Sequence, residues 1–113
     1  MFDLTNLTAH ATIDRKVRFD FIENTIGFGN PVVTCKKDRD KNGDALATLT
    51  DTGVIVIQEE VTETVITAYI ASIKQASYLY RKSKGNNKMP SALWAIINYN
   101  NNTEWYKKKT RAN

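Results

Sequence analysis

The stretch from residue 31 to residue 70 constrains the fold most, because short β-branched runs alternate there with turn residues. Asn42-Gly43 separates the first run from the second, and Asn-Gly is a strong hairpin signal since both residues tolerate positive φ angles. Connections this short between successive strands predict an antiparallel meander. We expect its four strands at residues 31–37, 45–50, 54–57 and 64–70.

Helical periodicity precedes this region. Ile13, Val17 and Phe21 recur at four-residue intervals between about Thr8 and Asn24, which predicts a helix with an apolar face. Three further apolar residues lie beside this stripe: Ala11, Ile22 and Ile26. Gly27 follows, and a glycine beyond the last periodic residue is typical of a helix end.

Helical spacing returns after the last strand. Residues 72–83 place Ile73, Ala76 and Tyr80 on one stripe. Ser91 is a candidate N-cap for a further helix. In that helix Trp94 could be buried against the core or could lie on an exposed face, and we expect the three asparagines at 100–102 to weaken the helical end.

The whole pattern predicts an α+β fold: an N-terminal helix, a four-stranded antiparallel meander sheet, and one or two C-terminal helices. The 113 residues leave room for one domain. Within it we expect a core in residues 1–84. Residues 85–113 form a basic C-terminal helical extension, either part of the same domain or loosely attached.

A cytoplasmic, reducing location fits the sequence. The single cysteine, Cys35, excludes an internal disulfide bond, and we see no apolar run after a basic start that would form a signal peptide. No stretch approaches the ~20 apolar residues that a membrane span needs.

Charge is divided unevenly along the chain. Residues 1–70 hold seven Lys or Arg and eleven Asp or Glu, a net charge of −4, whereas residues 71–113 hold nine Lys or Arg and only Glu104, a net charge of +8. Phosphate backbones are the commonest partners of such clustered cations, although a solvated basic tail without a ligand would look the same. Trp105 and Tyr106 add rings on which bases could stack, or they anchor the chain end on the core. The candidate nucleic-acid-binding residues are Lys74, Arg81, Lys82, Lys84, Trp105, Tyr106, Lys107, Lys108, Lys109 and Arg111.

His10 is the only histidine and lies one helical turn before Asp14, with Arg18 one turn further. The helix N-terminus disfavours the charged imidazole and the carboxylate favours it, so His10 could titrate near neutrality as a general acid or base. Arg15 and Arg18 could hold a phosphate. The alternative is a half-buried histidine among solvated charges.

Thr67 and Tyr69 alternate on the fourth predicted strand and therefore share a face. If the first helix packs on that face, a hydroxyl and a phenol would meet His10. The alternative is that Tyr69 belongs to the core or to the sheet surface.

The stretch Asp38–Asp44 resembles the opening of a calcium loop, with oxygen ligands at alternate positions. Leu49 stands where the bidentate glutamate would be needed, and predicted strands flank the loop, so we interpret it as a hairpin. No metal site and no cofactor are expected.

Two short stretches resemble a known family. Thr8-Ala9-His10-Ala11 with Arg15 and Arg18, followed by Val65-Ile66-Thr67-Ala68-Tyr69, is similar to the helix and last strand of the barnase–EndoU–colicin–RelE nuclease superfamily. The resemblance covers about residues 7–70. Asp14 departs from the family pattern, and residues 71–113 have no counterpart in it.

The resemblance implies metal-independent RNA cleavage by attack of the ribose 2′-hydroxyl on the adjacent phosphate. His10 would move the proton, Arg15 and Arg18 would offset the developing charge, and Thr67 and Tyr69 would bind the phosphate or donate to the leaving oxygen. Such folds occur in toxins and phage proteins, so an antitoxin, immunity or host protein partner would be implied.

Three functions remain open on the sequence: an endoribonuclease of toxin or phage type, a non-catalytic nucleic-acid-binding protein with RNA favoured, and a phage or mobile-element protein whose basic face docks on an acidic host protein. An exposed face carrying Trp94 and Ile97 would favour a dimer.

Overall fold

The computed structural model describes residues 13–37, 45–85 and 87–103. Its elements follow the predicted order of one helix, four strands and two helices, so the predicted α+β fold is confirmed. They are α1 (Ile13–Thr25), β1 (Pro31–Lys37), β2 (Ala45–Thr50), β3 (Val54–Glu59), β4 (Val65–Ile70), α2 (Ile73–Lys84) and α3 (Ser91–Asn101).

The four strands form one antiparallel sheet in the order β1-β2-β3-β4, as the short connections predict. The β1–β2 connection, with Asn42-Gly43 and the rest of Asp38–Asp44, lies outside the described residues. An irregularity in the β3–β4 pairing leaves Ile66 as an extra residue, because Gln58 pairs with Val65 and Ile57 pairs with Thr67.

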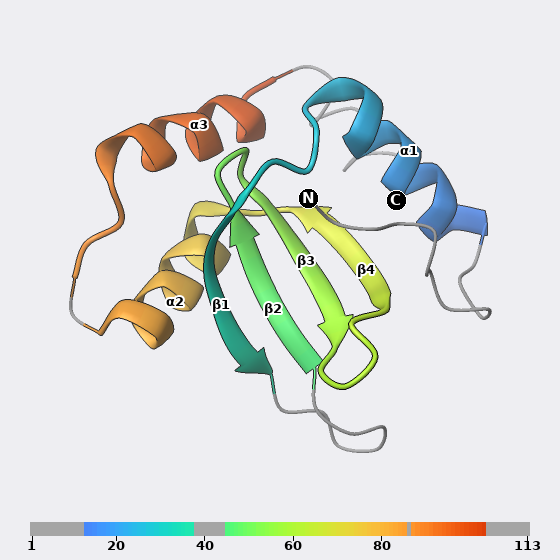
Figure 1. Ribbon diagram of the computed structural model, residues 1–113. Helices are drawn as coiled ribbons and strands as arrows, with labels where there is room; N and C mark the ends of the chain where they lie inside the picture. Colours follow the sequence, from blue (N-terminus) through green and yellow to red (C-terminus); the bar gives the residue numbers. More distant parts are fainter. Residues whose placement is uncertain (1–12, 38–44, 86, 104–113) are drawn as a thin grey trace.

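Helices lie on both sides of the sheet (Figure 1). α1 runs beside β4, and α2 and α3 lie on the side of β1 and β2. Each side buries its own apolar cluster. The α1 cluster contains Phe19, Ile22, Phe28, Val54, Val56, Val65 and Ala68. The α2–α3 cluster includes Ala47, Leu49, Ile55, Ile57, Ala76, Leu79, Leu93 and Ile97.

The buried face of α1 matches the predicted one only in part: Ile22 and Ile26 belong to it as predicted, whereas Val17 does not. Phe19 is 2% exposed and Ile22 is fully buried, whereas Val17 is 49% exposed. Apolar residues occur on more than one face of this helix, so their spacing alone does not identify the buried one. Packing selects Phe19 and Ile22, which lie one turn apart. At the helix end the N–H of Gly27, whose φ is 76°, donates to the Ile22 carbonyl over 2.8 Å.

α2 follows the sequence pattern closely. Ser72 is its N-cap, and the Ser72 and Gln75 side chains form a reciprocal capping box. Ala76 and Leu79 are buried, with Ile73 and Tyr80 packed against the same cluster. The predicted stripe is therefore confirmed.

α3 differs from the prediction at its start. Pro90 is the N-cap and no side chain caps the helix, so the proposed Ser91 cap is wrong. The Pro90 carbonyl accepts from the N–H of Trp94 over 3.0 Å, which makes Ser91 the first helical residue.

The asparagines near the α3 C-terminus attach that helix to the sheet. Asn100 is 3% exposed and its side-chain amide donates to the Thr52 carbonyl over 2.8 Å. Asn101 donates to the Ala71 carbonyl over 2.9 Å. With Leu93 and Ile97 in the core, α3 packs on the domain. None of the described helices has the length and apolar character that a bilayer crossing requires.

Candidate nucleic-acid interface

α2 brings four of the predicted nucleic-acid-binding cations into the described structure. Lys74, Arg81, Lys82 and Lys84 are all exposed, and the last three lie in its final turn. Cations there are favoured by the negative end of the helix dipole. Asp and Glu are absent from the sequence between residues 71 and 103, so no carboxylate of that segment neutralises them.

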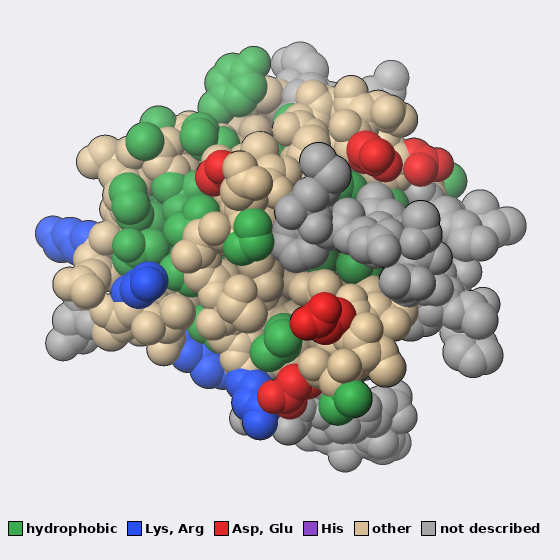
Figure 2. Space-filling view, viewed as in Figure 1, with side chains coloured by type: hydrophobic (Ala, Val, Ile, Leu, Met, Phe, Trp, Pro, Cys, Tyr) green, Lys and Arg blue, Asp and Glu red, His purple; other side chains and the backbone are tan. Residues whose placement is uncertain are grey.

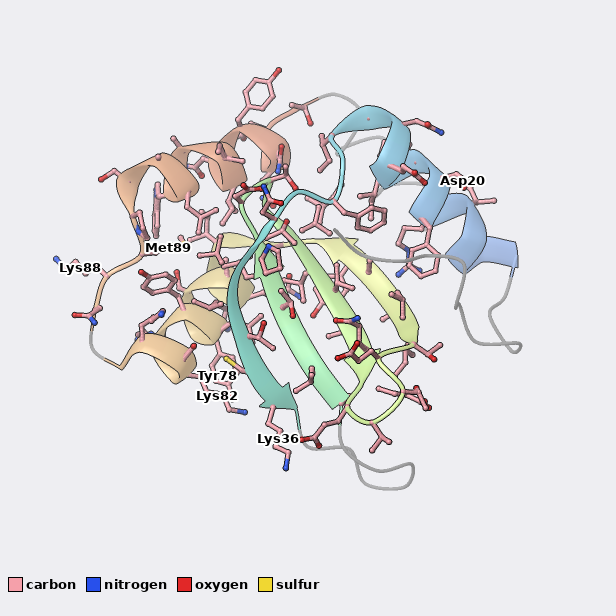
Figure 3. All side chains as sticks on the ribbon, in the orientation of Figure 1. Asp20, Lys36, Tyr78, Lys82, Lys88 and Met89 are labelled. Atoms are coloured by element: carbon pink, nitrogen blue, oxygen red, sulfur yellow. The ribbon has the colours of Figure 1, made fainter. Side chains whose placement is uncertain are left out.

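On the face drawn in Figure 2, the charged side chains of the described residues are unevenly distributed. Figure 2 shows Lys and Arg side chains at the left and lower left, over α2 and the end of β1, with most of the acidic side chains toward the right. Among the side chains labelled in Figure 3, Lys36, Lys82 and Lys88 lie on the α2 side and Asp20 lies on α1. One exposed ion pair bridges β1 to the β3–β4 turn, with Lys36 Nζ 3.5 Å from a Glu60 oxygen.

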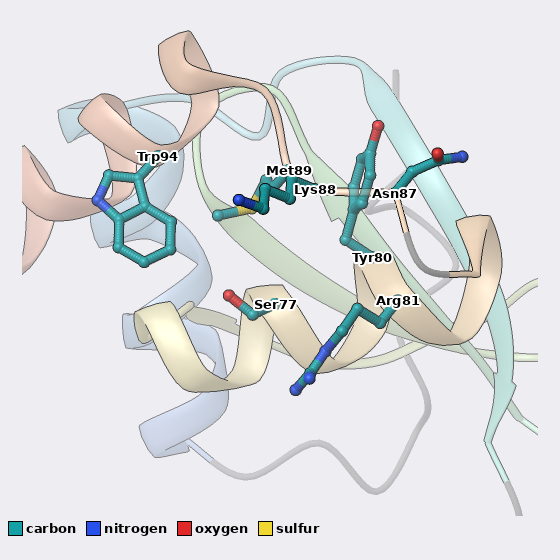
Figure 4. Close-up of a pocket in the computed structure, with 7 residues that line it drawn as sticks. All are labelled: Ser77, Tyr80, Arg81, Asn87, Lys88, Met89 and Trp94. Carbon is teal, nitrogen blue, oxygen red and sulfur yellow. The ribbon is translucent and has the colours of Figure 1, made fainter.

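A groove of about 400 Å³ lies between α2 and α3 (Figure 4). It combines two aromatic rings, two cations, a methionine, an amide and a hydroxyl. Its lining residues are Ser77, Tyr80 and Arg81 from α2, Asn87, Lys88 and Met89 from the connection, and Trp94 from α3.

Trp94 is 44% exposed, which excludes the alternative in which it is buried on the core. The physical reason is its position on α3. Leu93 and Ile97, four residues apart, form the stripe that enters the core, and this turns Trp94 toward the groove. Its ring is therefore partly accessible, in a groove that Arg81 and Lys88 also line.

A second cleft of about 330 Å³ lies beside α2, where the helix meets the sheet. Ala47, Ile55 and Leu79 supply apolar lining, and Tyr69, Tyr78, Gln75, Lys36 and Lys82 supply the polar groups. Burial raises the pKa of the Tyr69 phenol above its ordinary value, so the group is a protonated hydrogen-bond donor at neutral pH.

The catalytic candidates that the structure describes, Arg18, Thr67 and Tyr69, do not all meet at one place. Thr67 pairs with Ile57 and Tyr69 pairs with Ile55, so both share the face of the α2–α3 cluster, as strand alternation predicts. α1 packs its apolar side chains on the opposite face, and Tyr69 does not meet that helix as the catalytic hypothesis requires.

Arg18 nevertheless reaches Thr67. Its Nη1 donates to Thr67 Oγ1 over 3.3 Å and to the Ala68 carbonyl over 3.4 Å, which links α1 to the outermost strand β4. His10 lies outside the described residues, as does the Arg15 side chain. The convergence of the imidazole with Thr67 stays a prediction.

The remaining sequence candidates lie beyond Thr103 and outside the described residues: Trp105, Tyr106, Lys107, Lys108, Lys109 and Arg111. Cys35 is buried and its thiol donates to the Leu79 carbonyl over 3.3 Å. Among the residues the structure describes, no group of three or more His, Cys, Asp and Glu side chains could hold a metal ion.

Sequence reasoning missed most of the groove. Tyr80 was correctly placed on the stripe that packs on the core, but the sequence did not predict that it and Trp94 would line one groove. The missed signal was an aromatic residue on each of two consecutive helices beside Arg81 and Lys88, without a carboxylate between them.

Comparisons of the chain with protein-family models, with curated proteins and with solved structures find no match. The nuclease resemblance therefore stays a prediction, and the functional argument depends on the residues themselves.

Proposed function

We propose that this protein binds single-stranded nucleic acid, with RNA favoured, through the groove between α2 and α3. One observation carries the proposal: Tyr80 and Trp94 line the same groove as Arg81 and Lys88. Proteins that bind single strands commonly combine aromatic side chains, on which bases stack, with cations that contact the phosphates.

Two kinds of interaction contribute to this binding. Stacking of a base on an aromatic side chain contributes about 1–3 kcal/mol per base. Each phosphate neutralised on a single strand adds about −0.7 to the slope of log affinity against log salt concentration, because condensed counterions are released. A double helix keeps its bases stacked inside, so we expect it to bind less tightly.

Fluorescence anisotropy with labelled oligonucleotides tests the proposal. Single-stranded RNA, single-stranded DNA and duplex RNA of one sequence are titrated at several salt concentrations. We expect the single strands to bind more tightly than the duplex, with an affinity that falls as salt rises. Absence of measurable affinity for any of them at physiological salt would contradict the proposal, and would favour an acidic protein as the partner of the same cations.

Arg81 offers a matched pair of variants for the same titration. Arg81→Gln removes one cation from the groove, so we expect the salt slope to shrink by about 0.7. Arg81→Lys keeps the charge and should keep the slope, losing only the planar contacts of the guanidinium. Equal slopes in the wild-type protein and Arg81→Gln would remove Arg81 from the interface.

A second candidate function is metal-independent RNA cleavage, favoured by the contact of Arg18 with Thr67. That contact joins a cation of the proposed catalytic helix to a hydroxyl of the proposed catalytic strand. Labelled RNA incubated with the protein in EDTA tests it. We expect cleavage that disappears in His10→Ala and weakens in Thr67→Val. RNA that stays intact with the wild-type protein excludes this candidate and leaves binding untouched.

A further inference from the structure

α2 separates two clefts that share one chemical character. The groove toward α3 contains Tyr80 and Arg81. The second cleft, between α2 and the sheet, contains Tyr78, Lys82 and the β4 residue Tyr69. Each cleft therefore places aromatic rings beside a cation that comes from α2.

The helical repeat explains why the clefts lie on two sides of one helix. Ser77 and Arg81 are four residues apart and line the groove, while Tyr78 and Lys82, also four apart, line the second cleft. Lys74, Tyr78 and Arg81, at the spacing of one helical stripe, are exposed between them. α2 thus presents a narrow cationic ridge with a cleft on each side.

The second cleft is suited to a base and a phosphate. Lys82 Nζ donates to the Lys36 carbonyl over 2.9 Å and lies 6.0 Å from the centroid of the Tyr78 ring. These contacts hold its ammonium beside an exposed aromatic face. Tyr69 contributes a phenol that remains protonated at neutral pH, and Gln75 adds an amide that can donate and accept.

We propose that a single RNA strand crosses α2, with bases in both clefts and its phosphates on the ridge between them. This inference depends on the proposed function, because it extends the same binding surface across the helix. Charge complementarity selects the occupant: the exposed cations of α2 face no carboxylate of their own segment, and Glu60, on the β3–β4 turn, is paired with Lys36. An α-helix with its side chains is about 10–12 Å wide, so a strand that fills both clefts must be longer than one that fills either alone.

Two aromatic variants and one control separate the two-cleft arrangement from the groove alone. Tyr78→Ala removes a ring from the second cleft and Trp94→Ala removes one from the groove. Tyr99→Ala removes a ring that is 70% exposed on α3 and lines neither cleft. All three side chains are exposed, so we expect each variant to keep the fold, which far-ultraviolet circular dichroism checks.

Each variant is titrated with uridine oligonucleotides of about twelve and about four nucleotides, which both lie within the range of known single-strand site sizes, about 4–16 nucleotides. For the long oligonucleotide we expect Tyr78→Ala and Trp94→Ala each to weaken binding by about tenfold, and Tyr99→Ala to leave it unchanged. For the short one each loss should be smaller, because the oligonucleotide can occupy the intact cleft.

The outcomes distinguish this inference from the function on which it depends. If Trp94→Ala weakens binding of the long oligonucleotide and Tyr78→Ala does not, the groove binds alone and the two-cleft arrangement is wrong. If the wild-type protein binds neither oligonucleotide, the proposed function itself is wrong.

Discussion

The two sides of the sheet are alike inside and different outside. Both bury an apolar cluster, and each outermost strand accepts a hydrogen bond from a cation of the neighbouring helix, Arg18 to Ala68 on β4 and Lys82 to Lys36 on β1. Outside, α1 exposes the acidic residues Asp20 and Glu23 next to Arg18. The α2–α3 side exposes cations, aromatic rings and two clefts.

The two sides also differ in how fully their large apolar side chains are buried. Full burial of a large apolar side chain contributes about 1.5–3 kcal/mol, and Trp94 and Tyr78 forgo much of that contribution by staying exposed. Phe19 and Ile22 on α1 receive all of it. Burial does not account for exposed rings beside cations, whereas a ligand would, and this supports the proposal that nucleic acid binds on the α2–α3 side.

The largest effect on stability is expected on the α1 side. Phe19→Ala removes a buried ring that packs against Phe28 with centroids 6.4 Å apart, so we expect the free energy of unfolding to fall by about 3–5 kcal/mol. Trp94→Ala should cost much less, because its ring is 44% exposed. Denaturant unfolding measures the free energy of unfolding of both variants. Equal losses of free energy would contradict the expected difference between the two side chains.

A smaller effect is expected where α3 meets the sheet. Gly53 has a φ of 85°, and a Cβ there would lie 2.8 Å from Asn100 Nδ2 and 3.2 Å from Ile97 Cγ1. Gly53→Ala therefore adds a clash to the backbone strain, and we expect a loss of about 1–3 kcal/mol.

Gly27→Ala is the matched control, since Gly27 also has a positive φ, 76°, but beyond its chain neighbours no atom of the described residues lies within 4 Å of its added Cβ. Hydrogen exchange of the backbone amides shows where the structure is loosened. Gly53→Ala should accelerate exchange in α3 and leave exchange in α1 unchanged. Equal acceleration in both helices would show that α3 is not attached through Gly53 and Asn100.

The link between α1 and β4 is expected to contribute less. Thr67→Val removes one of the two hydrogen bonds that Arg18 donates to described residues of β4, and we expect a loss of about 0.5–1.5 kcal/mol in thermal or denaturant unfolding. Affinity for single-stranded RNA should not change, because Thr67 lines neither cleft. A drop in affinity as large as that of Trp94→Ala would move the binding surface to the α1 side.

The smallest effect is a pH dependence of stability from Tyr69. Burial raises its pKa in the folded protein above 10.0, so the folded state keeps a proton that the unfolded chain loses. This contribution is present below pH 10.0 and is lost as the pH rises through the folded pKa. Tyr69→Phe should show a shallower loss of stability above that pH than the wild-type protein, and identical slopes would contradict the burial of the phenol.

Much of the fold could be predicted because its signals are local. β-branched runs and turn residues predict the four strands, and the strand ends differ from the predictions by two residues or fewer. Ser72 and Gln75 cap the N-terminus of α2 with a capping box, a local signal that depends only on their residue types and spacing. The buried face of α1 could not be predicted fully from local signals. Val17 and Phe19 are both apolar, and only packing against the sheet decides which of them is buried.

The candidate site was harder to predict because it forms between elements. Lys82 and Arg81 could be predicted as exposed cations from composition alone. The groove also needs the rotation of α3 that buries Leu93 and exposes Trp94. The hydrogen bond from Asn100 to Thr52, which attaches α3 to the sheet, joins residues 48 positions apart. Asparagines near a helix end suggested a weakened helix, whereas here they attach it to the sheet.

Hydrogen exchange of the backbone amides with and without a single-stranded RNA oligonucleotide tests the division between the two sides most directly. We expect slower exchange in α2, in α3 and at the end of β1 when RNA is bound, with α1 unchanged. Slower exchange in α1 and β4, with α2 and α3 unaffected, would contradict the assignment of binding to the α2–α3 side.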